Sequence, residues 1–171
     1  MALVRAQLAV SVDGRIADAR GGVGWLEPFP AEDFGIQEFL NGIGTLVMGR
    51  TTYDQMLGFG PWPHGEKRTM VLTTRGLDAA GVEAVRPADA GRAVAALRGN
   101  TNGDVWVVGG ARTIAAMLAA RALDRLELHV IPVLVGDGIP LFGPDTLPQG
   151  LDAIQATALV KGVVRLVYVL R

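Results

Sequence analysis

The stretch DVWVVGGARTIAAMLAAR, residues 104–121, predicts a strand, a glycine turn and a helix in direct succession. Asp104–Val108 is an apolar run of strand length, and Arg112–Arg121 reads as a helix. Between them, Gly109 and Gly110 carry no Cβ atoms, so a ligand can approach the backbone where the helix begins. The free N–H groups and the positive end of the helix dipole favour an anion at that point. A single turn of this kind is more often only a tight connection. Further turns of the same kind are needed before a ligand site can be inferred.

Two further stretches place glycine or hydroxyl residues at the end of a strand. Thr45–Met48 is a short apolar strand followed by Gly49-Arg50 and a helix over Thr51–Leu57. Arg68–Thr73 is another strand, and it runs into Thr74-Arg75. Both stretches therefore repeat the combination of a strand end with hydroxyl groups and an arginine.

Parallel strands would bring all three turns to one edge of the sheet, where open α/β sheets bind their ligands. Guanidinium groups bind phosphate well. Arg50 and Arg75 would supply more positive charge than one pyrophosphate needs, which favours a nucleotide with an extra 2′-phosphate, such as NADPH. The alternative is that both arginines are ordinary solvated side chains. Neither GxGxxG nor GxxxxGK[ST] occurs, so the Rossmann fingerprint and the P-loop are excluded.

The order of the elements predicts an α/β fold. Strands alternate with helices in the first part of the chain, including a strand at Leu3–Val10 and helices at Ala31–Asn41 and Asp89–Arg98. Strands alone close the chain, at Leu126–Val135 and Val163–Leu170. We expect three layers: a mixed, mostly parallel sheet with helices on both faces and antiparallel strands at the C-terminal edge. Residues 1–171 contain no repeat or linker, so we expect a single domain.

Composition excludes several classes of function. Sixteen basic and seventeen acidic residues give a net charge of −1 without a basic block, so nucleic acid is not an expected partner. The chain has no cysteine and two histidines, which argues against disulfides, thiolate catalysis and a zinc site. No run is long and apolar enough to span a membrane, and the first ten residues are too short for a signal-peptide core. We therefore expect a cytoplasmic protein that binds neither a metal nor a membrane.

Two carboxylates and two tryptophans are candidates for contact with a second ligand. Glu32 and Asp33 open the helix expected at Ala31–Asn41, where acids are also favoured by the helix dipole alone. Trp25 and Trp62 fall in loops, where they would either wall a pocket or simply pack. We leave both alternatives open for all four residues.

The two histidines are interpreted as structural. His129 falls inside a strand between Leu128 and Val130, which is typical of a packed or solvent-facing sheet residue. His64 lies in a Pro-Gly loop without candidate metal partners.

Five motifs in order resemble the dihydrofolate-reductase-like superfamily. They are SVDGRI (residues 11–16), LVMGRTTYD (46–54), VLTTR (71–75), VVGGARTI (107–114) and LELHVIPVLVGDGIPLF (126–142). The set looks closest to the branch related to the reductase domain of the bifunctional riboflavin-biosynthesis deaminase–reductase. The resemblance extends over nearly the whole chain, from Leu3 to Leu170.

This resemblance implies an NADPH site built from the three turns. Gly49, Arg50, Thr51 and Thr52 would hold the 2′-phosphate and its neighbours, and Leu72, Thr73, Thr74 and Arg75 would line the adenosine pocket. The pyrophosphate and nicotinamide would lie against Val108, Gly109, Gly110, Ala111, Arg112, Thr113 and Ile114, with Ala9, Val10 and Ile16 beside the ring. Asp13 is also expected to bind the cofactor.

The resemblance also implies a carboxylate that holds the substrate early in the first helix. It falls on Asp33 or Glu32, because one extra residue separates the Trp and Pro-Ala landmarks from the acid. We take Asp33 and Glu32 as the catalytic candidates, and Trp25, Asp33, Gln37 and Trp62 as the substrate contacts.

The sequence also departs from the resembled pattern. The riboflavin enzymes usually have Glu before the Gly-Gly pair and often Lys after the Asp-Gly pair, where this chain has Val108 and Arg15. Without cysteine there are no ligands for a zinc deaminase. The expected function is a stand-alone NADPH-dependent reductase that transfers a hydride to a pterin-like or pyrimidine-like heterocycle.

Two other functions use the same pocket and stay open. One is an NADPH-binding sensor or sequestering protein without turnover, and the other is a flavin or quinone reductase. We also expect a homodimer, because the apolar strands at Leu126–Val135 and at the C-terminus would otherwise leave an unpaired edge.

Overall fold

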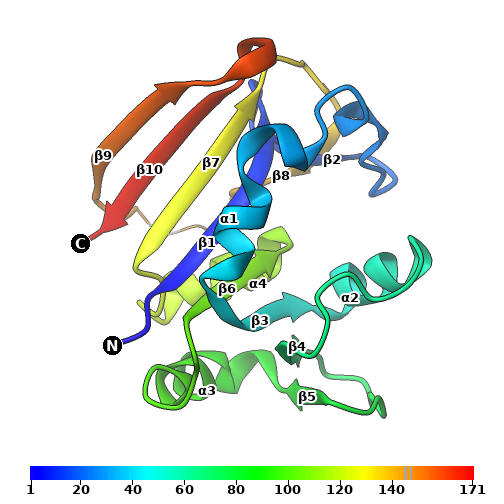
Figure 1. Cartoon of the computed structure of the whole chain (residues 1–171), viewed down its shortest axis with the longest axis vertical. Coiled ribbons are helices and arrows are strands. Elements are labelled where there is room, and N and C mark those ends of the chain that lie inside the picture. The colour runs from blue at the N-terminus through cyan, green and yellow to red at the C-terminus, as the bar shows by residue number, and fades with distance from the viewer. Residues whose placement is uncertain (145, 147) are drawn as a thin grey trace.

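The computed structural model describes residues 1–144, 146 and 148–171 (Figure 1). Eight strands form one sheet: β1 Val4–Ser11, β3 Ile43–Gly49, β4 Arg68–Leu72, β5 Val82–Val85, β6 Asp104–Gly109, β7 Arg125–Ile131, β9 Leu151–Ala158 and β10 Val164–Leu170. Their order is β5-β4-β3-β6-β1-β7-β10-β9. All pairs from β5 to β7 are parallel, and β10 is antiparallel to both β7 and β9. The expected mixed sheet with antiparallel strands at the C-terminal edge is confirmed.

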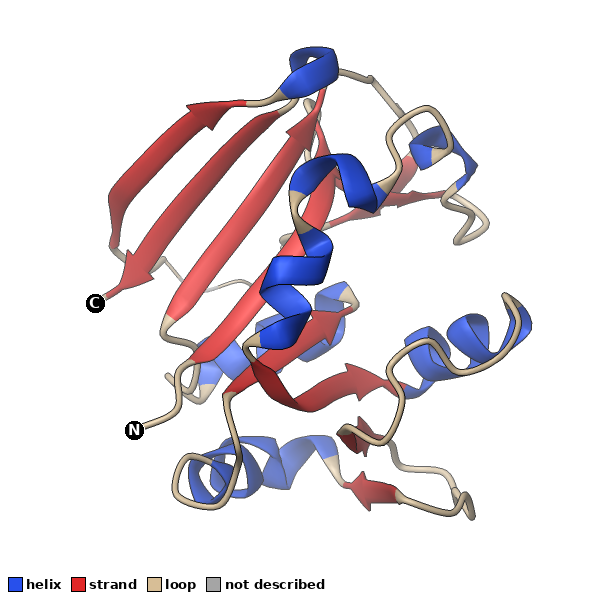
Figure 2. Cartoon of the chain, in the orientation of Figure 1, coloured by secondary structure: helices blue, strands red, loops and turns tan. Residues whose placement is uncertain are grey.

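The helices form the two outer layers, as Figure 2 shows. They are α1 Ile36–Asn41, α2 Arg50–Gly58, α3 Ala90–Leu97 and α4 Ala111–Ala119, with short 3₁₀ turns η1 Gly24–Leu26, η2 Ala31–Phe34, η3 Pro87–Asp89 and η4 Val160–Gly162. A small antiparallel sheet pairs β2 Arg15–Asp18 with β8 Gly138–Pro140. Within the described residues, every helix is too short or too polar to cross a membrane.

Alternating side chains of the central strands supply two apolar clusters, one on each face of the sheet. Val47 and Val107 join the cluster with α3 and α4. Leu46 and Trp106 join the cluster with α1 and α2. Because these parallel strands are buried on both faces, they read as continuous apolar runs in the sequence. Figure 1 shows α1 in front of β1.

Two expectations about the elements were wrong. The helix expected at Ala31–Asn41 is divided at Gly35, whose φ of +76° is the left-handed conformation that glycine adopts easily. The strand expected at Leu126–Val135 ends at Ile131, because Pro132 has no N–H to donate to a ladder. That strand is also not an edge: β7 is paired with β1 and β10, and the open edge on this side is β9.

Candidate cofactor and substrate site

The ends of three neighbouring parallel strands meet at one edge of the sheet. In the register of the sheet, Met48 on β3 is opposite Gly109 on β6, and Gly49 is opposite Leu72 on β4. A Cβ atom added at Gly49 would lie 2.9 Å from Oγ1 of Thr113, so the β3–α2 turn is packed directly against the start of α4. The structure therefore brings together the three turns that the sequence singled out.

The Gly109-Gly110 turn leads directly into α4. The peptide bond between the two glycines is cis. The carbonyl oxygen of Gly110 accepts from the N–H groups of Thr113 and Ile114, at 3.0 and 3.1 Å. A Cβ atom at Gly110 would meet Ile16 Cδ1 and Thr52 Oγ1, each at 3.7 Å. Side chains from β2 and α2 thus face this turn, while Ala111 and Arg112 form the first positions of the helix.

Arg50 and Arg75 converge on one carboxylate. Nε of Arg50 donates to Asp54 Oδ1 at 2.7 Å, and its Nη1 donates to the carbonyl oxygen of Gly76 at 2.9 Å. Nη2 of Arg75 lies 4.0 Å from Asp54 Oδ2. The two arginines expected at a 2′-phosphate therefore lie beside each other. Asp54 was missed from the sequence, although its spacing of four residues from Arg50 in a helix is typical of an ion pair.

The hydroxyl groups of this edge differ in exposure. The Thr73 side chain is buried and accepts from the N–H of Arg75 at 3.0 Å, which fixes the turn after β4. Leu72 is buried beneath it. Thr51 and Thr74 are exposed, so their hydroxyl groups are accessible at the same edge.

The turn after β1 is held by Asp13. Its carboxylate accepts from Ser11 Oγ at 2.6 Å and from the N–H groups of Val135 and Gly136 at 3.1 and 2.7 Å. These hydrogen bonds, that of Ser11 first, lower the pKa of Asp13 to about 2. The carboxylate thus joins two loops, and its expected part in the cofactor site stays a prediction. Ala9 and Val10 lie at the end of β1, half-buried and buried respectively.

The candidate acids lie on the exposed turn η2. Oδ2 of Asp33 pairs with Nζ of Lys161 at 2.8 Å, and the same Nζ donates to the carbonyl oxygen of Pro28 at 3.0 Å. Lys161 in η4 was missed, because nothing in the sequence relates it to η2. Glu32 is exposed, and the exposed Gln37 donates to Asn41 Oδ1 at 3.3 Å. The catalytic role of Asp33 or Glu32 stays a prediction.

The two candidate tryptophans, Trp25 and Trp62, are half-buried. Nε1 of Trp25 is buried and has no hydrogen-bond partner in the described part of the chain. Trp62 packs on Tyr53 and on His64, with ring centroids 5.6 and 5.3 Å apart. His64 also contacts Trp106, at 5.6 Å, and its burial lowers its pKa below 6.5, helped by the nearby charge of Lys67.

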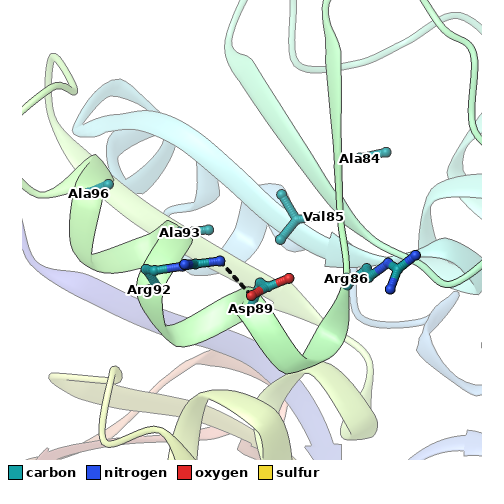
Figure 3. Close-up of a pocket in the computed structure, with 7 residues that line it drawn as sticks. All are labelled: Ala84, Val85, Arg86, Asp89, Arg92, Ala93 and Ala96. Atoms are coloured by element: carbon teal, nitrogen blue, oxygen red, sulfur yellow. Dashed lines mark hydrogen bonds and ion pairs between the residues drawn. The ribbon is translucent and has the colours of Figure 1, made fainter.

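An open hollow of about 510 Å³ lies elsewhere, between β5 and the segment η3–α3. Arg92 pairs with Asp89 at 2.7 Å on its wall (Figure 3). None of the residues that the sequence assigned to a site lines it. The lining residues are Ala84, Val85, Arg86, Asp89, Arg92, Ala93 and Ala96.

The fold and the turns at the strand ends define a three-layer α/β protein of the dihydrofolate-reductase-like class. Dihydrofolate reductase from Enterococcus faecalis, in complex with NADP(H), has the same fold with a TM-score of 0.71 at 21% identity, over 99% of this chain and 96% of that one. The chain belongs to the RibD C-terminal domain family, whose model matches residues 61–165.

Two further proteins are similar over most of their length. A putative riboflavin biosynthesis protein from Shewanella sp. PV-4 superposes with a TM-score of 0.85 at 27% identity, over 100% of this chain and 99% of that chain. The uncharacterized protein YwjB of Bacillus subtilis strain 168 is 35% identical over 139 residues, 79% of each chain. The chain is therefore homologous to reductases of the riboflavin-pathway type, as the sequence resemblance implied.

Proposed function

We propose that the chain is an NADPH-dependent reductase that transfers a hydride to a planar nitrogen heterocycle, pyrimidine-like or pterin-like. The observation that carries this proposal is the convergence of Arg50 and Arg75 beside the start of α2. Two guanidinium groups next to free helix N–H groups suit a phosphate that NADPH has and NADH lacks. Membership of the RibD C-terminal domain family supports the reductase class.

The residues of the three turns fit a dinucleotide. Gly49 and Gly110 directly precede two helix starts, whose first N–H groups can hold phosphate, and the side chains of Thr52 and Ile16 face Gly110. Gly110, Ala111 and Arg112 would hold the pyrophosphate, and Ala9 would lie beside the nicotinamide. When bound, the cofactor supplies the hydride, and the protein orients the two rings and keeps water out.

Calorimetric titration with NADPH and NADH tests the cofactor. We expect the wild type to prefer NADPH at least tenfold, about 1.4 kcal/mol. Arg50→Ala should reduce that preference, because the lost contact exists only with the 2′-phosphate. Arg68→Ala is the control, since Arg68 is exposed at the opposite end of β4 and pairs with Glu83. An equal loss for both cofactors in Arg50→Ala would contradict the assignment.

A second candidate function follows from the ion pair between Asp33 and Lys161. This pair engages the acid expected to hold a substrate, which favours an NADPH-binding protein without turnover. Following NADPH oxidation with pyrimidines, pterins and flavins separates the two. Turnover with any heterocycle supports the reductase, and tight NADPH binding without turnover across all three classes supports the second candidate.

A further inference from the structure

The sheet face beneath η2 and α1 is unusually polar where β1, β7 and β10 meet. Gln7, Glu127 and His129 point to this face, and each is at most 6% exposed. Residues below a helical layer are normally apolar, and buried polar groups are normally hydrogen-bonded. The partners of these side chains therefore show which of them the fold itself explains.

Two ion pairs account for the burial of the Glu127 carboxylate. Nε of Arg5 donates to its Oε1 at 2.6 Å, and Nη2 of Arg165 donates to its Oε2 at 2.7 Å. The guanidinium of Arg5 also lies over the ring of Phe39, 4.7 Å from its centroid. Both carboxylate oxygens are thus engaged, and Glu127 is left with little capacity to accept from a ligand.

The burial of His129 is not accounted for by such contacts. Its Nε2 is buried and has no hydrogen-bond partner among residues 1–144, 146 and 148–171, and the same holds for Nε of Arg165. The two residues are directly opposite each other on β7 and β10. Leaving a buried polar atom unpaired destabilises a fold, because the atom loses its hydrogen bonds to water. Two such atoms on neighbouring strands indicate a place where another molecule completes the hydrogen bonds.

Strand register places this pair beside the proposed nicotinamide. His129 is opposite Ala9 on β1, and β1 is paired with β6, which ends at the Gly109-Gly110 turn. Neighbouring strands are about 4.8 Å apart, so β7 runs two strand spacings, roughly 10 Å, from β6. A ring that receives a hydride over Ala9 therefore comes within reach of His129. Phe34 of η2, with its centroid 5.9 Å from the imidazole, provides an apolar wall.

We propose that His129 and Arg165 bind the substrate, donating from Nε2–H and Nε–H to a carbonyl-bearing edge of the heterocycle. The inference rests on the proposed function and deepens it. The groups left without a partner determine which edge of the heterocycle faces them. The nearby acceptors are already paired, Glu127 with two arginines and Asp33 with Lys161. An arginine side chain only donates, and His129 donates from Nε2 in its Nε2–H tautomer, so a carbonyl oxygen can accept from both groups.

Two matched pyrimidines test whether the site binds a carbonyl-bearing edge of the heterocycle. In 5,6-diaminouracil two ring carbons carry carbonyl oxygens, and in 2,4,5,6-tetraaminopyrimidine the same carbons carry amino groups. Calorimetric titration of the protein, alone and loaded with NADPH, should show about tenfold tighter binding of the uracil. His129→Phe keeps an aromatic ring against Phe34 but has no nitrogen, and it should lose that preference. His64→Phe is the control and should retain it.

Imidazole ¹⁵N spectra of the wild type provide a second measurement that does not depend on a variant folding. The chain has two histidines, so the His64→Phe spectrum assigns both sets of signals. The uracil should shift the Nε2 signal of His129 and leave that of His64 in place. Uracil binding that leaves the His129 signal unmoved would overturn the proposal.

The remaining outcomes separate this inference from the proposed function. Equal affinity for the two probes, or full uracil affinity in a folded His129→Phe, overturns the role of His129. NADPH binding without any binding of the uracil also overturns it and leaves the cofactor assignment standing. Uracil binding with the His129 shift, but without NADPH binding, supports this site and overturns the proposed reductase.

Discussion

Arg50 donates to the carboxylate of Asp54 at 2.7 Å, one turn further along α2. Arg75, at the end of the neighbouring strand, lies 4.0 Å from the other carboxylate oxygen. Asp54 therefore contacts both guanidinium groups, at the position where the proposed 2′-phosphate would bind. If that proposal holds, the carboxylate that holds the arginines together in the free protein would also compete with the phosphate.

Asp54→Asn should raise the affinity for NADPH roughly two- to fivefold and leave that for NADH unchanged. The expected size follows from the small free energy of exposed ion pairs, about 0.2–1 kcal/mol. Calorimetry with both cofactors measures it. Asp89→Asn is the control, because Asp89 is also 45% exposed and also pairs with an arginine of its own helical segment. Weaker NADPH binding in Asp54→Asn would mean that Asp54 positions Arg50 for the phosphate.

Gly49→Ala should lower the free energy of unfolding by about 1–3 kcal/mol. The backbone at Gly49 has a φ of −78°, which alanine adopts without strain, so the cost comes from the new Cβ at 2.9 Å from the buried Thr113 hydroxyl. Denaturant unfolding measures the loss. Gly58→Ala at the other end of α2 has open space and should be nearly neutral.

The contact with Thr113 can be isolated by a second substitution. Thr113→Ala in the Gly49→Ala background should recover stability, giving a favourable coupling energy in the double-mutant cycle. Additive losses in that cycle would show that Gly49 is needed for another reason.

Glu127→Gln should destabilise the fold by about 2–3 kcal/mol, because it leaves Arg5 and Arg165 facing each other without the charge between them. The matched substitution Glu83→Gln removes the carboxylate of the exposed Arg68–Glu83 pair and should cost less than about 1 kcal/mol. Urea unfolding of both variants checks the difference. Similar small losses would indicate that water already solvates the Glu127 cluster.

Stability should fall on acidification because of His64. Burial lowers the pKa of His64 below 6.5, so between that lowered value and 6.5 the unfolded chain binds more protons than the native one. The free energy of unfolding therefore decreases as the pH falls through about 6.5 and levels off below the folded-state pKa. Burial, with the charge of Arg165, lowers the pKa of His129 and adds to the same trend.

His64→Phe should make this pH dependence shallower. Denaturant unfolding of the wild type and the variant at about pH 7.5 and pH 5 measures the two slopes. Identical slopes would exclude His64 as a source of the acid sensitivity.

The sequence was sufficient for the sheet and for the meeting of the three turns at one edge, because both depend on local patterns. Apolar runs such as Leu46–Met48 are buried on both faces, and each glycine turn lies between a strand and a helix. The break at Gly35 could not be predicted, since Ile36, Phe39 and Leu40 keep a helical spacing on one side of it. Local pattern does not report the left-handed conformation that a glycine takes when the chain must turn.

The substrate side could not be predicted for a different reason. Lys161, which pairs with Asp33, lies on η4, and Arg165, which is opposite His129, lies on β10. Both are far along the chain, and only the folded structure brings them close. A histidine inside a strand shows which face it shares with Glu127, but alternation alone does not say what covers that face. The sequence left open whether His129 is packed or faces solvent. The structure shows that it is buried and that its Nε2 has no hydrogen-bond partner in the described part of the chain.

The homodimer remains a prediction. Because β7 is internal to the sheet, the strand at which two chains would meet is now β9. This open edge carries a bulge: Ala153 and Gln155 pair with successive residues of β10, which leaves Ile154 unpaired and 54% exposed. Bulges discourage strand addition at an edge, so we expect contact through apolar side chains. Sedimentation velocity at micromolar concentration should show a dimer for the wild type and a monomer for Ile154→Lys. Leu134→Lys, in the loop after β7, is the control and should stay dimeric. A monomeric wild type would exclude a stable dimer at this strand.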